Sequence, residues 1–122
     1  MLFAAVEEIF TMAFDAFRTD DAELAYRVEP LEERIDALCD NMKLHHVERL
    51  QQGLCSIGQG FIFNDLLTNF ERIADHSSNL AVAVIELREN ELDAHGYINS
   101  LKALHSHNFD ELYEEYSRKY AI

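Results

Sequence analysis

The stretch AELAYRVEPLEERIDALCDNM, residues 22 to 42, decides the fold class, because its apolar residues recur every three or four positions. These residues are Leu24, Val28, Leu31, Ile35, Leu38 and Met42. An α-helix has about 3.6 residues per turn, so this spacing lines one face of a helix, as in helical bundles. We predict a helix over about residues 22 to 52. Pro30 should kink or restart it, because proline lacks a backbone N–H and crowds the preceding turn.

The same periodicity continues on both sides of this stretch. It predicts one helix over about residues 2 to 18 and another over about residues 55 to 90, with Gly53 ending the helix between them. The remainder indicates a shorter helix that is broken at HSHN, residues 105 to 108. With four glycines, one proline and no sustained alternation of apolar and polar residues, the chain gives no sheet signal. We therefore predict an all-α antiparallel bundle of three long helices plus a broken C-terminal helix, forming one domain over residues 1 to 122.

Composition narrows the classes of partner. The chain has 122 residues, with 10 Lys and Arg against 23 Asp and Glu, so its net charge of -13 argues against nucleic acid and favours cations. No basic leader and no apolar run long enough for a membrane span is present, so we expect a soluble chain, or a soluble piece of a longer one. The two cysteines have no zinc-like spacing, so we expect them to be reduced thiols in a cytoplasmic compartment.

Two pairs of carboxylates suggest a metal site. Glu32 and Asp36 lie four residues apart in one predicted helix, and Glu71 and Asp75 have the same spacing in the next. Residues four apart share a helix face, so antiparallel packing in register would bring all four together. Carboxylates held that closely raise one another's pKa or recruit a cation. The alternative is a solvated acidic face that neighbouring arginines partly neutralise, and spacing alone favours this alternative.

A basic group near the end of the second predicted helix suggests a different contact. His46 and Arg49 lie about one turn apart and offer charged donors to an anion such as phosphate. The simpler reading is that they interact with the negative end of the helix dipole.

The local sequence adds a family resemblance. ERIADH, residues 71 to 76, followed by Asn79-Leu80-Ala81, resembles the helix motif E-R-I-x-D-H of the PhoU family, and LEERID, residues 31 to 36, resembles its companion acidic motif. In that family such acidic motifs bind clustered iron or zinc ions, and the proteins regulate phosphate uptake. The resemblance therefore implies iron or zinc as the cofactor, with His76 and Asn79 beside the site and four metal ligands: Glu32, Asp36, Glu71 and Asp75.

The chain departs from the family in its length. A free-standing PhoU protein has two such repeats and this chain has one. Residues 45 to 79, with DAHGYINSL after them, resemble the cytosolic C-terminal domain of bacterial sodium/phosphate cotransporter-family proteins. This resemblance implies a regulatory domain without catalytic activity, located at the inner face of the membrane, whose partner is a membrane transporter domain or transporter complex.

Several alternatives stay open. The chain could be a free-standing single-repeat regulator or a helical interaction module that binds no metal. A di-metal carboxylate enzyme is less consistent with the sequence, because such sites use Glu-x-x-His on two helices and this chain contains no Glu-x-x-His. The wide apolar face of the first predicted helix also suggests a homo-oligomer.

Overall fold

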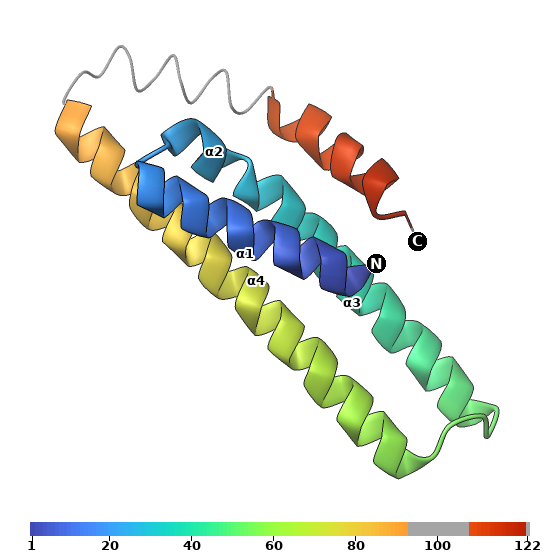
Figure 1. Ribbon diagram of the computed structural model, residues 1–122. Coiled ribbons are helices and arrows are strands. Elements are labelled where there is room, and N and C mark those ends of the chain that lie inside the picture. Colours follow the sequence, from blue (N-terminus) through green and yellow to red (C-terminus); the bar gives the residue numbers. More distant parts are fainter. Residues whose placement is uncertain (93–107, 122) are drawn as a thin grey trace.

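The computed structural model describes residues 1–92 and 108–121, apart from the side chains of residues 89–92. Within these ranges the regular structure is entirely helical, with α1 (Leu2–Thr19), α2 (Ala22–Tyr26), α3 (Val28–Gln51) and α4 (Ile57–Leu92) in that order (Figure 1). Residues 108–119 are also helical, and we call residues 108–121 the C-terminal segment. The predicted all-α bundle is confirmed. The predicted break at HSHN lies almost wholly outside the described residues.

The first helix ends through backbone geometry at Asp20. This residue adopts a left-handed conformation, with φ 54°, and its backbone N–H donates a hydrogen bond to the carbonyl oxygen of Ala16. Aspartate tolerates that conformation better than most residues, because its short polar side chain can bond locally. The next residue, Asp21, caps α2 by accepting a hydrogen bond from the N–H of Leu24 at 3.2 Å. The turn between α1 and α2 therefore depends on two adjacent aspartates, Asp20 and Asp21.

Pro30 restarts the helix instead of kinking it. The predicted helix over residues 22 to 52 is divided at Arg27, and α3 begins at Val28. Pro30 thus lies in the first turn of α3, where the missing N–H of a proline has no intrahelical partner to lose. Of the two outcomes expected for this proline, the restart is the one observed.

The connection from α3 to α4 is short and well defined. Gly53 adopts φ 73°, a conformation that a residue with a Cβ rarely takes, and ends the α3 side of the turn. Ser56 then caps α4 reciprocally with Gln59: its hydroxyl accepts the N–H of Gln59 at 3.1 Å, and its own N–H donates to the Gln59 side chain at 3.2 Å. The result is a long antiparallel hairpin of α3 and α4.

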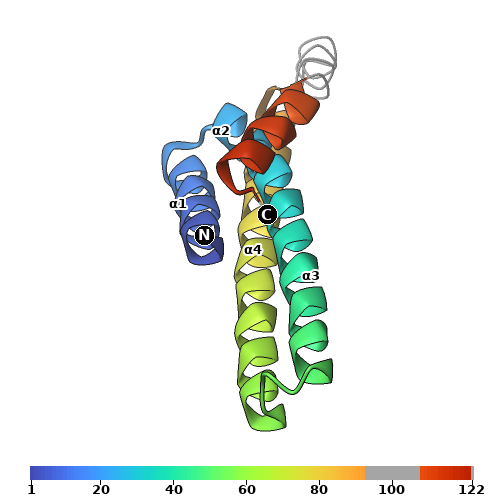
Figure 2. The same ribbon diagram turned by 90° about the vertical axis from the view of Figure 1, so that its right-hand side faces the viewer.

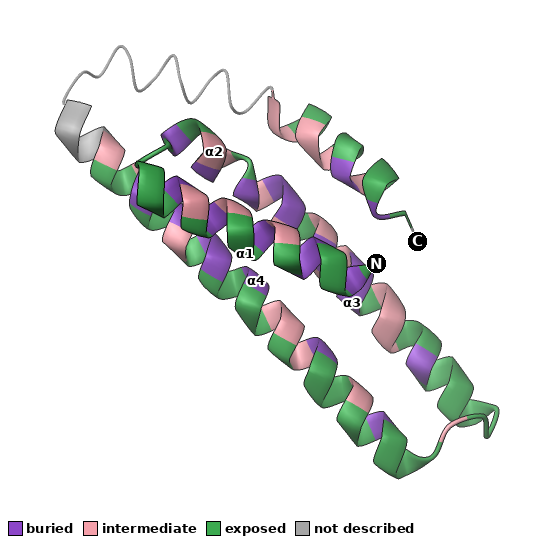
Figure 3. Ribbon diagram, in the orientation of Figure 1, coloured by how far each residue is buried: buried purple, intermediate pink, exposed green. Residues whose placement is uncertain are grey.

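The helix α1 packs along one half of this hairpin and runs in the same direction as α4 (Figure 2). The Phe3 ring lies 6.3 Å from the ring of Phe70, and Asp20 at the other end of α1 forms an ion pair with Arg88 at 3.4 Å. Buried positions concentrate where α1 covers the hairpin, whereas the far end of the hairpin is mostly exposed (Figure 3). The largest fully buried apolar side chains are Ile9, Leu31, Ile35, Leu38, Leu67 and Val28.

The C-terminal segment returns to the bundle and packs across α1 and α3. Tyr116 and Tyr120 are buried against the core. Arg34 of α3 donates two hydrogen bonds to the backbone carbonyl of Tyr120, at 2.9 and 2.6 Å. Lys119 reaches Glu8 of α1 at 2.6 Å, and the Tyr120 hydroxyl donates to the same carboxylate at 2.9 Å.

Candidate metal centre

The seam between α3 and α4 brings three of the four predicted ligands together. One carboxylate oxygen each from Glu32, Asp36 and Asp75 lies within 4.8 Å of the others. Glu32 and Asp36 are one turn apart on α3, and the antiparallel hairpin places Asp75 of α4 opposite them. Each helix supplies part of the group, so its geometry depends on the register of the hairpin. We call these three residues the acidic cluster.

The electrostatics of the acidic cluster reflect its crowding. Burial raises the pKa of Glu32 to about 8, and hydrogen bonding and repulsion from Asp36 act in the same direction. Burial also raises the pKa of Asp36, helped by the carboxylates of Asp75 and Glu71 and opposed by the hydrogen bond with Glu32. Glu32 therefore holds a proton near neutral pH, and that proton reduces the repulsion within the cluster.

The fourth predicted ligand, Glu71, has a different neighbour. Its carboxylate lies 2.7 Å from the ammonium group of Lys43 on α3. Because the hairpin is antiparallel, Glu71 lies about one turn farther toward the connection than Asp75 does, opposite Lys43. Glu71 stays close enough to the cluster to raise the pKa of Asp36. It thus borders the cluster while forming an ion pair of its own.

Two residues that the sequence analysis did not identify continue the row of polar residues on the side of the acidic cluster away from Glu71. The buried Ser78 hydroxyl of α4 donates a hydrogen bond to Glu29 of α3. Glu29 and Ser78 each lie three residues from a cluster member, on the same helix faces, and this spacing is the signal that could have identified them. The two predicted neighbours of the site, His76 and Asn79, have exposed side chains and are not members of the cluster.

The predicted anion contact lies farther along the hairpin. The His46 ring is buried, and its centre lies 4.9 Å from the centre of the Phe63 ring. The Arg49 guanidinium lies 5.5 Å from the centre of the Phe63 ring. A Cβ on Gly60 would come within 2.8 Å of His46 Nε2, so the glycine lets α4 approach the histidine. Nε2 is buried and has no hydrogen-bond partner among the described residues. Anion binding by His46 and Arg49 stays a prediction.

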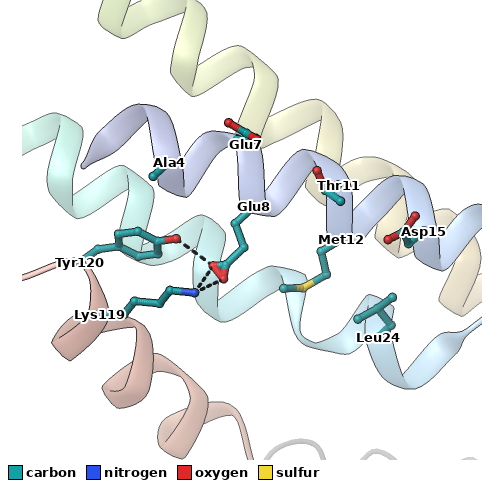
Figure 4. Close-up of a pocket in the computed structure, with 9 residues that line it drawn as sticks. All are labelled: Ala4, Glu7, Glu8, Thr11, Met12, Asp15, Leu24, Lys119 and Tyr120. Carbon is teal, nitrogen blue, oxygen red and sulfur yellow. Dashed lines mark hydrogen bonds and ion pairs between the residues drawn. The ribbon is translucent and has the colours of Figure 1, made fainter.

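A separate surface pocket of about 500 Å³ lies between α1 and the C-terminal segment (Figure 4). Glu8 is central to it, because it accepts the bonds from Lys119 and Tyr120 that attach the segment. Burial raises the pKa of Tyr120, and its hydrogen bond with Glu8 acts in the same direction. The other lining residues are Ala4, Glu7, Thr11, Met12, Asp15 and Leu24. The pocket shares no residue with the acidic cluster, and the bonds that cross it belong to the docking of the C-terminal segment.

The acidic cluster has the chemistry of a cation site. Its three carboxylates present oxygen ligands, which suit hard cations and iron. A cation there would replace the proton on Glu32 as the source of neutralising charge, since ligands bind metal in the deprotonated form. It would also connect α3 to α4 directly. The donor set therefore fits the metal role that the motifs implied for these three residues.

Comparison with known proteins places the chain in a family. The model of the PhoU domain matches residues 2–84. The phosphate-specific transport system accessory protein PhoU homolog 1 of Thermotoga maritima is 29% identical over 84 residues, which cover 69% of this chain and 36% of that protein. The chain thus spans little more than a third of the length of that relative, and no solved structure matches it. Because the family match extends from α1 through most of α4, the chain belongs to the PhoU domain family.

Proposed function

We propose that this domain regulates phosphate transport and that a metal ion bound at the acidic cluster is part of the regulation. The observation that carries the proposal is the convergence of Glu32, Asp36 and Asp75 at the α3–α4 seam of a PhoU domain. The name of the Thermotoga relative, an accessory protein of a phosphate-specific transport system, supports the physiological context. Iron or zinc is the proposed ion, from the family resemblance of the motifs.

The proposed role of the metal is to set the packing of α3 against α4. With the ion bound, Glu32 and Asp36 on one helix and Asp75 on the other would share one positive centre, so the seam would tighten. Without it, the seam depends on a protonated Glu32 and on the ion pair between Lys43 and Glu71. A domain whose seam has two such states can signal to a partner without catalysing a reaction.

The proposed partner is a membrane transporter domain or a transporter complex. We propose that the chain is the cytosolic part of a sodium/phosphate cotransporter-family protein, on the basis of the sequence resemblance of residues 45 to 79. None of the described helices is both long enough and apolar enough to cross a bilayer. In this proposal membrane helices of the longer protein carry the phosphate, and this domain adjusts their activity.

An interaction module that binds no metal is the second candidate. The ion pair between Lys43 and Glu71 favours it, because one of the four predicted ligands already has a positive partner. On this reading the acidic cluster is stable with Glu32 protonated, and the domain regulates only through its surfaces.

Phosphate uptake separates these two candidates. In cells that produce the full-length native protein, we would replace Asp36 and Asp75 together by asparagine and follow the uptake of radiolabelled phosphate at high and low external phosphate. The control is Asp65→Asn, an exposed acidic residue of α4 outside the cluster. The proposal predicts altered regulation only in the double variant. Unchanged regulation in that variant, at equal protein levels, would favour the interaction module.

Cell fractionation tests the transporter context independently. An antibody against this domain should detect, in native cells, a membrane-bound protein much heavier than the 14.1 kDa of this chain. A soluble protein of about that mass would contradict the proposal that the chain is part of a cotransporter-family protein. It would favour a free-standing single-repeat regulator.

A further inference from the structure

The free end of the α3–α4 hairpin is apolar and exposed. Among the described residues, the four most exposed large apolar side chains all lie here, and each is at least 70% exposed: Leu54, Ile57, Phe61 and Ile62. Leu54 belongs to the connection between the two helices, and the other three belong to the first two turns of α4. The helix α1 covers the opposite half of the hairpin and leaves this end open (Figure 3). We call residues 50–64 the hairpin end.

The hairpin end differs in charge from the rest of the molecule. It is the longest stretch of the chain without a charged residue or a histidine, and all 23 acidic residues lie outside it. At about 1.5 Å per residue along α4, Asp75 of the acidic cluster lies about 27 Å from Ile57, which is more than three Debye lengths at physiological ionic strength. The carboxylates that border the stretch are Glu48, which has Arg49 beside it, and Asp65, about 12 Å along α4 from Ile57. The net charge of -13 is therefore concentrated away from this end.

The connection within the hairpin end satisfies much of its own backbone. The N–H groups of three successive residues, Gln52, Gly53 and Leu54, donate to carbonyl oxygens in the last turn of α3 at 2.9 to 3.2 Å. On the α4 side, Ser56 and Gln59 cap each other through both backbone N–H groups. A polar group that leaves water without a partner carries a high free-energy cost, and these internal bonds lower that cost for the turn.

We propose that the hairpin end inserts into the surface of a lipid bilayer. Ile57 and Phe61 are one turn apart on α4, whereas Ile62 lies about 100° farther around the helix than Phe61, so the exposed side chains face different sides of one narrow end. A fluid apolar phase surrounds such an end, whereas a flat protein surface covers one side of it. Ile62 lies about 7.5 Å along α4 from Ile57, within the depth of about 5–10 Å to which interfacial helices bury their apolar residues.

This proposal deepens the proposed function and rests on it for its physiological setting. A domain attached to membrane helices stays within reach of lipid, and attachment raises the effective concentration of the bilayer, so weak intrinsic binding is sufficient. Insertion would fix one end of the α3–α4 hairpin at the membrane. The seam that carries the acidic cluster would then lie between this fixed end and the half of the hairpin that α1 covers.

Co-sedimentation of the 122-residue chain with phosphatidylcholine vesicles tests the proposal, because these vesicles carry no net charge. At millimolar lipid we expect binding that Ile57→Asp with Phe61→Asp weakens at least 100-fold. Both side chains are exposed, so far-UV circular dichroism should show unchanged helicity. The control is Phe10→Asp with Phe14→Asp, which adds the same charge at two exposed phenylalanines of α1 and should bind like the wild type. Absence of wild-type binding would overturn the proposal, as would binding that is lost only in the control variant.

A fluorescent reporter locates the inserted residues directly. The chain has no tryptophan, so Phe61→Trp and Phe14→Trp each introduce a single probe. With vesicles, emission of the Phe61→Trp probe should shift to shorter wavelength and be quenched by lipids brominated in their acyl chains, while emission of the Phe14→Trp probe should stay constant. The reverse pattern would place the lipid contact on α1 and overturn the proposal. Binding to native membranes that protease treatment abolishes, without binding to lipid vesicles, would identify a protein as the occupant and also overturn it.

Failure of this proposal and failure of the proposed function are distinguishable. If the substitutions in the acidic cluster alter phosphate regulation but the chain does not bind vesicles, the proposed function stands and lipid insertion is wrong. If the chain binds vesicles through the hairpin end but those substitutions leave regulation unchanged, lipid insertion stands and the proposed role of the acidic cluster is wrong.

Discussion

Raising the pH without added metal should destabilise the bundle, because folded Glu32 holds a proton that the unfolded chain has already lost. Its pKa is about 8 in the folded chain, against about 4.5 for a glutamate in the unfolded chain. Between these values the folded state binds more protons than the unfolded state, so the free energy of unfolding falls as the pH rises. The stabilisation is fully present below about pH 4.5 and is lost as the pH passes through about 8.

The size of the effect follows from the same shift. A difference of about 3.5 pKa units corresponds to nearly 5 kcal/mol at most, since each unit is about 1.4 kcal/mol. Glu32 is only half-buried, so solvent screening reduces the figure. We expect a loss of about 1 to 2 kcal/mol between pH 5 and pH 9.

Urea denaturation at several pH values, followed by far-UV circular dichroism, measures this loss. Glu32→Gln should remove most of the pH dependence in this range, because glutamine does not ionise. Glu33→Gln is the matched control: it is the adjacent residue, it is exposed, and it lies outside the acidic cluster. Its pH dependence should equal that of the wild type. If wild type and Glu32→Gln lose stability in parallel, the proton on Glu32 is not the cause and the electrostatic account of the cluster is wrong.

Three further predictions concern packing and reactivity. Gly60→Ala should be less stable to urea than Gly58→Ala by about 1 to 3 kcal/mol, because a methyl group at residue 60 meets the buried ring of His46 at 2.8 Å whereas one at residue 58 meets nothing within 4 Å. Arg34→Ala should cost about 1 to 2 kcal/mol and speed hydrogen exchange in the C-terminal segment, because that segment loses two hydrogen bonds from a charged donor. A thiol reagent at pH 8 should label Cys55 quickly and Cys39 only after unfolding, because Cys39 is buried and burial raises its thiol pKa to about 12.

Each of these three has an outcome that contradicts it. Equal stability of the two glycine variants would mean that α3 and α4 do not approach closely at residue 60. Unchanged exchange in Arg34→Ala would mean that the buried tyrosines alone hold the C-terminal segment; Arg72→Ala, an exposed arginine of α4, is the control. Two reactive thiols in the folded chain would contradict the burial of Cys39.

Much of the fold was predictable because one physical signal, apolar spacing, repeats along the chain. The ends of the helices were less predictable. Pro30 signalled a disturbance, but the break lies three residues earlier, at Arg27, because a proline fits the first turn of a new helix and not its interior. The proline shows that the helix cannot continue undisturbed, but neither the proline nor the apolar spacing decides between a kink and a restart.

The candidate metal centre was predictable to the level of helix faces and no further. The four-residue spacing placed each carboxylate pair on one face, but which residues meet depends on the register of α3 against α4. That register puts Asp75 beside Glu32 and Asp36, and puts Glu71 beside Lys43. Register follows from the packing of the whole hairpin and the length of its turn, so no local pattern in the sequence encodes it.

Metal binding by the acidic cluster is the central claim, and titration calorimetry of the metal-free chain tests it most directly. With iron(II) under anaerobic conditions, and separately with zinc, we expect saturable binding that is lost when Asp36 and Asp75 are both replaced by asparagine and retained in Asp65→Asn. We also expect protons to be released on binding near neutral pH, because Glu32 must ionise to act as a ligand. Absence of binding for both metals, or equal binding by the double variant, would contradict the claim and leave the cluster as a proton-stabilised seam between two helices.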